Sequence, residues 1–351
     1  MVLFLANFPD KHTLTEGMSQ RMVAIDERAM DQQRVYLFVS HRCFWSMETA
    51  ETKPGVIQYR CNLFRHFGFI CKLLRDASVI YIHSVINLMP LLPAWLLAAK
   101  GSRTVFDAHG VVPEEHLLAG FKLKGRLYGL TESALFRRAD VVVTVSRSME
   151  RHFRKKYPQS RAAYITYPIL PVHLVRHQDR LPSVAADDTV RVVYSGNTQK
   201  WQNIELMLSL IRRNLSGNIH YDILTRDTEQ MNRYLAQAGL EGEKGIHVAC
   251  VPPETLGDYY SRAHYGFVLR DDITVNRVAC PTKLVEYLYY GIIPIVKSPA
   301  IGDFQEMEYE YLQHPEFVPG LKARKSQTNR LIVERMLAAY NVPDIANLFK
   351  G

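Results

Sequence analysis

The sequence has few cysteines, and they are not arranged in pairs. Cys43, Cys61, Cys71, Cys250 and Cys280 are scattered along 351 residues and form no C-x-x-C motif. An odd, scattered set excludes a disulfide framework and a cysteine zinc site. It is typical of a protein from a reducing compartment.

Long hydrophobic runs are also absent. The longest run, residues 85–99, is shorter than a membrane-spanning helix and contains Asn87, Pro90 and Pro93, so we expect no transmembrane segment. Residues 1–10 lack the basic start of a signal peptide and predict a first strand instead. The sequence therefore predicts a cytoplasmic protein, which can also lie peripherally at the inner face of the cell membrane.

Acidic residues are scarce in the first half of the chain. Residues 1–180 contain 25 Lys and Arg against 15 Asp and Glu, whereas residues 181–351 contain 18 against 20. A basic half suggests an anionic partner such as membrane lipid, a phosphorylated acceptor or nucleic acid. The alternative is a solvated basic surface without a partner. Nucleic acid is disfavoured, because no zinc-finger spacing or RNA-binding aromatic motif occurs.

Apolar, β-rich runs alternate with helical patterns along both halves of the chain, which predicts parallel sheets with helices on both faces. The expected strands are residues 2–8, 34–40, 78–84, 103–110 and 139–146, followed by 190–196, 219–225, 245–251, 263–269 and 292–296.

The fold class that follows is α/β, with two Rossmann-like, doubly wound parallel-sheet domains that face a cleft. Residues 167–188 lose the periodicity and predict a linker. We expect an N-terminal acceptor-binding domain at 1–175 and a donor-binding domain at 186–330. A C-terminal helix at about 330–351 is predicted to pack back on the first domain.

The stretch CPTKLVEYLYYGIIPIV, residues 280–296, predicts a short helix from Pro281 to Tyr290, with Gly291 just past its end. Lys283 lies in its first turn, where the helix dipole opposes a cation. A bound phosphate would remove that conflict, and Glu286, one turn later, can accept hydrogen bonds from a ribose diol. The alternative is a surface Lys–Glu pair at i,i+3.

This stretch resembles the donor-binding signature of retaining GT-B fold glycosyltransferases of the family-four type (glycosyl transferases group 1). The resemblance implies that Glu286 binds the nucleotide ribose and that Thr282 and Lys283 meet the diphosphate. Residues 192–208 resemble the first strand and glycine turn of the family's second domain. There, Gly196, Asn197 and Lys200 would lie near the leaving diphosphate.

Three further residues are assigned by the same resemblance. Gly17 falls in the loop after the first strand, where the family has glycines near the phosphates. His109, in DAHG, matches a histidine that faces the donor sugar, with Asp107 supporting His109 or capping a turn; the alternative is a hydrogen-bonded loop histidine. Some relatives carry an arginine soon after the first strand of the second domain, where this sequence has only Lys200, and Arg270 either compensates for its loss or is a surface charge.

The implied reaction is a retaining transfer of a sugar from a UDP- or GDP-sugar to a hydroxyl of a glycan acceptor. His109, Lys200 and Lys283 are the expected catalytic residues. The chain contains no D-x-D motif, so we expect no metal and no other cofactor, with cationic side chains in place of Mg²⁺. A polyprenyl-diphosphate-linked acceptor, used in bacterial surface polysaccharide or exopolysaccharide synthesis, would fit the basic first domain.

Other functions remain open at this point. A sugar-nucleotide 2-epimerase or a sugar phosphorylase would share the fold, as would a non-catalytic protein that binds nucleotide sugars. A nicotinamide enzyme is disfavoured, because no G-x-G-x-x-G follows the first strand.

Overall fold

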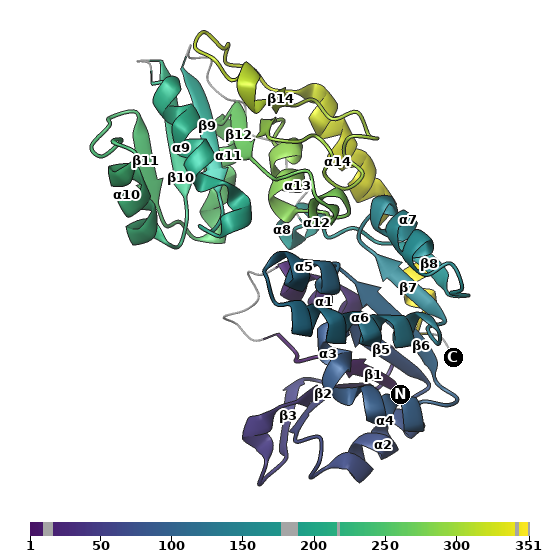
Figure 1. The fold of residues 1–351 in the computed structure, drawn as a ribbon. Helices are drawn as coiled ribbons and strands as arrows, with labels where there is room; N and C mark the ends of the chain where they lie inside the picture. Colours follow the sequence, from purple (N-terminus) through teal and green to yellow (C-terminus); the bar gives the residue numbers. More distant parts are fainter. Residues whose placement is uncertain (10–16, 177–188, 216–217, 341–343, 350–351) are drawn as a thin grey trace. The chain divides into compact units, whose positions relative to one another are not determined.

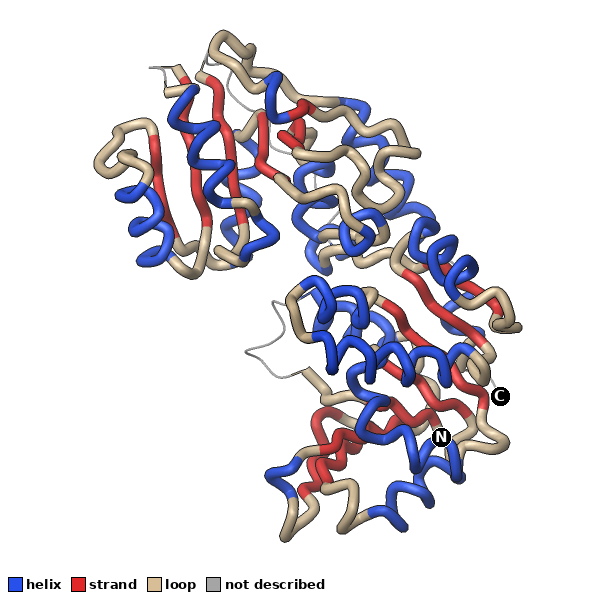
Figure 2. The backbone as a smooth tube through the Cα atoms, viewed as in Figure 1, coloured by secondary structure: helices blue, strands red, loops and turns tan. Residues whose placement is uncertain are grey.

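The computed structural model describes residues 1–9, 17–176, 189–215, 218–340 and 344–349. The chain divides into two compact units (Figures 1 and 2). The N-terminal unit comprises Met1–Ile169 together with Asn341–Gly351, and the C-terminal unit comprises Leu170–Tyr340. The predicted linker lies partly outside the described residues, at 177–188; the part before it includes the short helix α8 (Val172–Arg176).

The N-terminal unit is built on an eight-stranded sheet with the order β3-β4-β2-β1-β5-β6-β7-β8. All neighbouring strands are parallel except β3, which pairs antiparallel with β4 at one edge. The strands are β1 (Val2–Leu5), β2 (Arg34–Val39), β3 (Glu48–Lys53), β4 (Val56–Cys61), β5 (Val79–His83), β6 (Arg103–Ala108), β7 (Val141–Thr144) and β8 (Ala163–Thr166).

Helices cover this sheet. They are α1 (Gly17–Glu27), α2 (Phe67–Asp76), α3 (Val85–Leu88), α4 (Leu92–Ala98), α5 (Val112–Leu118), α6 (Lys122–Phe136) and α7 (Arg147–Lys156), with α15 (Asp344–Asn347) near the C-terminus. Phe349, just after α15, packs against the rings of Phe4 and Tyr81 from β1 and β5. The end of the chain therefore completes the core of the N-terminal unit.

The C-terminal unit is a six-stranded, fully parallel sheet with the order β11-β10-β9-β12-β13-β14. Its strands are β9 (Val190–Ser195), β10 (Ile219–Leu224), β11 (Ile246–Ala249), β12 (Tyr265–Val268), β13 (Ile293–Val296) and β14 (Leu312–Gln313). Its other helices are α9 (Ile204–Arg213), α10 (Thr228–Gln237), α11 (Leu256–Arg262), α12 (Thr274–Arg277), α13 (Thr282–Tyr289) and α14 (Gln327–Tyr340).

The strand order of each unit reverses once. In the N-terminal unit the chain runs outward from β1 through β2, and then outward the other way from β5 through β6. In the C-terminal unit the same reversal lies between β9 and β12. Because crossovers are right-handed, the helices on the two sides of the reversal cover opposite faces. Ligands of such sheets bind beyond the carboxyl ends of the strands at the reversal.

The structure confirms the two parallel α/β sheets and the ten predicted strands, most of them one or two residues shorter at their ends. Four strands were missed: β3, β4, β8 and β14. Strand β3 reads ETAETK and is almost fully exposed, so it lacks the apolar run by which a buried parallel strand is recognised. Strand β14 has only two residues.

Candidate active site

The strand reversal of the C-terminal unit brings together most of the residues predicted to bind a nucleotide sugar. Gly196 follows β9, and Arg270 comes two residues after β12 ends. Helix α13, which carries Lys283 and Glu286, connects towards β13. Residues from the sequence segments at 196, 270 and 283–286 therefore gather at one edge of the sheet.

Helix α13 is fixed to the sheet by Tyr287. Its ring lies against β12 at Gly266, where a Cβ atom would overlap with the ring. Its hydroxyl accepts a hydrogen bond of 3.0 Å from the backbone N–H of Ser195, at the end of β9. Tyr287 thus ties the helix to both strands of the reversal, and it sets where the side chains one turn earlier must lie.

Lys283 is partly buried and does not form the surface pair with Glu286 that was the alternative prediction. Its Nζ donates to Gln202 Oε1 at 3.1 Å and lies 4.5 Å from the centre of the Tyr194 ring. A Cβ at Gly196 would stand 3.6 Å from this Nζ. Burial, and after it the charge of Arg270, lower the pKa of Lys283 to about 7.

Arg270 is the second cation of this site. Its guanidinium donates to Asn276 Oδ1 at 3.3 Å, and its buried Nε has no hydrogen-bond partner among the described residues. Burial lowers its pKa. Neither Arg270 nor Lys283 forms an ion pair with an acidic side chain of the described chain. Two cations are therefore held close together. The Glu286 carboxylate acts on Lys283 only as a weaker effect and forms no ion pair with either cation, so the pair favours a bound anion.

The amino end of α13 adds to this positive field. Helix α13 begins at Thr282 with Pro281 as its N-cap, one residue later than the predicted start. The first N–H groups of a helix have no carbonyl partner within it, and the helix dipole makes this end partially positive. Gly291 follows the helix with φ of 68°, as its predicted place beyond the helix end requires.

Glu286 lies one turn deeper, with its side chain 14% exposed. The Tyr260 hydroxyl lies 3.4 Å from Glu286 Oε2 and donates to Ser195 Oγ at 2.8 Å. His173 Nε2, from α8, lies 3.7 Å from Glu286 Oε1. Burial raises the pKa of Glu286 to about 7, against the opposing effects of Tyr260 and Lys283.

The remaining predicted donor residues of the C-terminal unit lie nearby but are less enclosed, and Gly17 belongs to the N-terminal unit. Lys200 begins the short 3₁₀ helix that ends at Gln202, and its side chain is exposed. Asn197 is exposed and accepts from the N–H of Gln199. Thr282 is half-buried at the start of α13. Gly17, predicted in a loop, is the first residue of α1, directly after residues 10–16, which lie outside the described chain.

In the N-terminal unit, His109 belongs to a buried polar cluster at the ends of β5 and β6. Its ring centre lies 4.3 Å from that of His83, the last residue of β5. His83 Nδ1 lies 3.1 Å from Asp107 Oδ2, and Arg21 binds both oxygens of Asp107 at 2.6 to 3.0 Å. The prediction that Asp107 supports His109 or caps a turn is wrong, because its oxygens are occupied by Arg21 and His83.

The charges of this cluster follow from its burial. Burial alone would raise the pKa of Asp107, but Arg21 and His83 outweigh it and hold that pKa well below its usual range. Burial, and then the neighbouring His83, lower the pKa of His109 to about 3. His109 is thus a neutral hydrogen-bonding group near pH 7. It is too weak a base to take a proton from an alcohol.

The same cluster has the spacing of a metal site. One nitrogen of His83, one of His109 and a carboxylate oxygen of Asp107 lie within 4.8 Å of one another. However, the buried guanidinium of Arg21 already neutralises Asp107. The positive charge of Arg21 would also repel a metal cation bound beside it. These residues fit a network of hydrogen bonds better than a metal centre.

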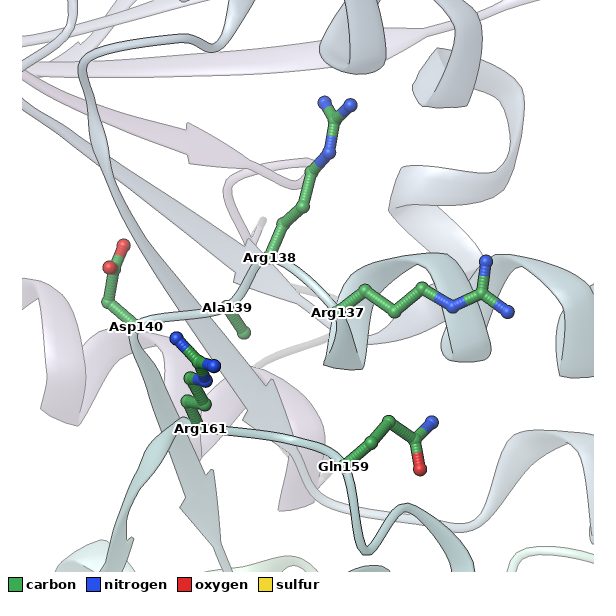
Figure 3. A pocket seen from close by; sticks show the side chains of 6 residues that line it. All are labelled: Arg137, Arg138, Ala139, Asp140, Gln159 and Arg161. Atoms are coloured by element: carbon green, nitrogen blue, oxygen red, sulfur yellow. The ribbon is translucent and has the colours of Figure 1, made fainter.

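A hollow of about 410 Å³ lies at the opposite edge of the N-terminal sheet, before β7 and β8. It is lined by Arg137, Arg138, Ala139, Asp140, Gln159 and Arg161 (Figure 3). The guanidinium groups of Arg137 and Arg138 point in different directions. Arg138 also donates to Leu96 O and lies over the Trp95 ring. Because ligands of parallel sheets bind at the carboxyl edge, we do not assign the reaction to this hollow.

Sequence reasoning missed several contributors to the two clusters. His83 could have been found, because it ends a predicted strand in the same way that His109 follows one. Arg21 carries no such signal: it meets Asp107 across 86 positions of the sequence. Tyr194, Gln202 and Tyr260 look like ordinary core or loop residues until the fold places them beside Lys283 and Glu286.

Comparison with known proteins identifies the N-terminal part of the chain. Residues 16–168 match the family model of the glycosyl transferase 4-like domain. The match lies within the N-terminal unit, which is a glycosyl transferase 4-like domain. The chain's two parallel-sheet units match the GT-B fold of solved glycosyltransferases. No curated protein matches the sequence.

Three solved structures illustrate the likeness in fold. The lipopolysaccharide outer core galactosyltransferase WaaB has a TM-score of 0.64 at 13% identity, over 99% of this chain and 97% of WaaB. Sucrose-phosphate synthase from Thermosynechococcus elongatus has 0.60 at 15%, over 99% and 96%. HepE from Anabaena, solved with UDP and glucose, has 0.56 at 10%, over 99% and 92%. Within the described residues, no helix is both long enough and apolar enough to cross a membrane.

Proposed function

We propose that this protein transfers a sugar, with retention of configuration, from a nucleoside-diphosphate donor to a hydroxyl of a lipid-linked glycan. The observation that carries the donor assignment is the pair of cations Lys283 and Arg270, which lie together at the strand reversal of the C-terminal unit and form no ion pair within the described chain. A diphosphate is the ligand that supplies the missing negative charge. HepE, which shares the fold, was solved with UDP and glucose.

The nucleotide is proposed to lie along α13. The diphosphate meets the amino end of α13, Lys283 and Arg270, with Gly196 leaving room for close approach. Glu286 accepts hydrogen bonds from the ribose hydroxyls one turn deeper. Thr282, Asn197 and Lys200 line the outer side of the diphosphate.

The chemical step breaks the bond between the anomeric carbon and the diphosphate oxygen and forms a bond to the acceptor oxygen. Negative charge develops on the leaving diphosphate, so cations held in place beforehand lower the barrier. Lys283 and Arg270 supply that charge, and we expect no requirement for Mg²⁺. The acceptor proton passes to the leaving phosphate, and neutral His109 orients a sugar hydroxyl.

The acceptor is proposed to be a glycan on a polyprenyl diphosphate, used in bacterial surface polysaccharide or exopolysaccharide synthesis. Support comes from the basic N-terminal half and from WaaG, a glycosyltransferase involved in lipopolysaccharide biosynthesis, which shares the fold at 10% identity and a TM-score of 0.59. An epimerase with the same donor site would convert a UDP-sugar without any acceptor, so product analysis separates the two reactions.

A thermal-shift screen with UDP, GDP and ADP tests the donor site. One nucleoside diphosphate is expected to raise the melting temperature of the protein without added Mg²⁺, because binding only to the folded state stabilises it. At a hundred times the dissociation constant the gain is about 2.7 kcal/mol. The shift should vanish in Glu286→Ala and persist in the exposed-residue control Glu254→Ala. An unchanged shift in Glu286→Ala would contradict the proposed ribose site.

Affinity for the nucleotide sugar selected by that screen should depend on pH. In the free protein the pKa values of Lys283 and Glu286 are both about 7. The diphosphate favours the Lys283 ammonium, which is lost above pH 7, and the ribose diol favours the Glu286 carboxylate, which is lost below pH 7. We therefore expect the highest affinity near pH 7, with losses of up to about tenfold per pH unit on either side.

Calorimetry in two buffers of different ionisation enthalpy checks the signs of this dependence. Binding should take up protons at alkaline pH, through Lys283, and release protons at acidic pH, through Glu286. In Glu286→Gln the proton release at acidic pH should disappear and the uptake at alkaline pH should remain. A flat pH profile would show that neither side chain changes protonation on binding.

A further inference from the structure

An exposed apolar surface runs over α5 and α6 of the N-terminal unit. Its members are large hydrophobic residues that are 45 to 73% exposed although they lie in helices or the turn between them. They are Leu117, Leu118, Phe121, Leu123, Leu127 and Leu130. We call this set the apolar face. Clustered apolar exposure of this kind marks an interaction site, whereas single exposed leucines are ordinary.

The geometry of α6 separates this face from the protein core. Leu123, Leu127 and Leu130 have the spacing i, i+4, i+7, so they form one row along the helix. The core-facing row of the same helix is a different set, which includes Tyr128, Leu135 and Phe136. Helix α6 is thus apolar on two sides, and its own unit covers only one of them.

The apolar face is held in a fixed shape. Helix α5 ends at a turn through Gly120, with φ of 85°, and the Phe121 N–H donates to His116 O at 2.9 Å. A Cβ at Gly125 would overlap with the Leu117 side chain and stand 3.1 Å from Pro113 O. The absence of a side chain at Gly125 therefore lets α6 pack tightly against α5. The six apolar side chains lie on a preformed hairpin of helices.

Cations are interleaved with the apolar face. Lys122, Lys124 and Arg126 are all exposed, and Lys124 Nζ lies 5.6 Å from the centre of the Phe121 ring. The sequence contains no acidic residue from His116 to Thr131. Exposed leucine and phenylalanine beside lysine and arginine is the composition of a helix that lies in the interface of an anionic membrane.

From these observations we propose that the apolar face of α5 and α6 binds the surface of an anionic lipid bilayer. A second copy of the chain fits the face less well, because a symmetric dimer through it would bring Lys122, Lys124 and Arg126 against their own counterparts. The proposal rests on the proposed function, because a lipid-linked acceptor would require the protein to reach a membrane surface. The binding itself requires no nucleotide.

Two other apolar or basic segments of the N-terminal unit do not suit lipid contact. Trp95 is 1% exposed and belongs to the core. In the basic stretch of α7, Lys156 is bound by Glu114 and Glu132, and Arg154 pairs with Glu150. The segment around Phe121, in contrast, combines exposed apolar side chains with cations that form no ion pair with an acidic side chain of the described chain.

Sedimentation of the full chain with vesicles tests the proposal. Phosphatidylcholine vesicles with and without phosphatidylglycerol are compared at low and high salt. We expect the protein to bind the anionic vesicles at low salt. Binding to neutral vesicles should be at least about tenfold weaker, and high salt should weaken binding to the anionic vesicles. No binding to the anionic vesicles, or equal binding to both kinds, would overturn the proposal.

Matched variants locate the surface. Leu123→Ser with Leu130→Ser is expected to weaken vesicle binding about tenfold or more. The control pair, Leu97→Ser with Leu331→Ser, removes two leucines that are 65% and 46% exposed elsewhere and should bind as the wild type does. Lys122→Gln with Lys124→Gln should weaken binding to anionic vesicles, whereas Arg212→Gln with Arg213→Gln on α9 should not. Equal loss in a test pair and its control would overturn the assignment.

Two readouts keep this test apart from that of the donor site. The nucleotide-induced thermal shift should be the same in all four variants, which also shows that they are folded. If the protein binds vesicles but no nucleotide raises its melting temperature, the donor assignment is contradicted and the proposed membrane surface is not. Light scattering without vesicles tests whether the apolar face instead joins two copies of the chain. A dimer of the wild type that dissociates in Leu123→Ser with Leu130→Ser would overturn the proposal, and we expect none.

Discussion

Lys283→Ala is expected to lower the rate of glycosyl transfer by about 10²- to 10³-fold, which is the usual loss when one preorganised group that stabilises developing negative charge is removed. The physical reason is that Lys283 is held beside Gly196 and Arg270 by the fold, and it needs no rearrangement as charge grows on the leaving diphosphate. Transfer is measured as release of nucleoside diphosphate in the presence of acceptor. Lys244→Ala, at an exposed lysine of the same unit, serves as the control.

The stability of Lys283→Ala separates a catalytic role from a structural one. In the free protein Lys283 is partly buried and is held near the like charge of Arg270, which costs free energy. Removing it should leave the melting temperature of the free protein unchanged or raise it, as is common when a strained functional site is relieved. Full activity of Lys283→Ala, or a loss of activity explained entirely by unfolding, would contradict the proposed role.

Asp107→Ala is expected to reduce the free energy of unfolding of the N-terminal unit by about 3–5 kcal/mol. The side chains of Arg21 and Asp107 are 1% and 0% exposed, so the substitution leaves a buried guanidinium without its counter-ion. Urea denaturation followed by tyrosine and tryptophan fluorescence measures the loss. Asp258→Ala, in the exposed first turn of α11, should change stability by less than about 0.5 kcal/mol.

A second substitution shows whether the loss at Asp107 arises from the unpaired Arg21. In the double variant Arg21→Met with Asp107→Leu, both charges are gone, and the two apolar side chains can fill the site. Part of the lost stability should then return, because removing both partners costs less than removing one. If the loss of unfolding free energy in the double variant equals the sum of the losses in Arg21→Met and Asp107→Leu, the unpaired Arg21 is not the cause.

The strands and helix α13 show which parts of the fold could be predicted from the sequence. Long apolar runs such as those of β1, β5 and β9 are recognisable because parallel strands buried on both faces are continuously hydrophobic. The position of α13 could also be predicted, since proline before it and glycine after it mark its ends. Strand β3, polar and exposed at the sheet edge, gives no comparable signal.

The site residues divide in the same way. Lys283 stood out because a cation in the first turn of a helix conflicts with the helix dipole, and a local conflict of this kind is visible in sequence. Arg270 had two equally good interpretations until the structure placed it beside Lys283. The partner of Asp107 was assigned wrongly, because nothing in the local sequence indicates that Arg21 and His83 reach its oxygens before His109 does.

By itself, then, the sequence determined the two α/β units, the helix with Lys283 and Glu286, and the resemblance to glycosyltransferases, since each depends on patterns a few residues long. Only the tertiary structure decided which charges form no ion pair, which histidines lie beside each other and which leucines of α6 remain exposed to water. Those properties depend on neighbours from distant parts of the chain, because burial and pairing are set by the packing of whole elements.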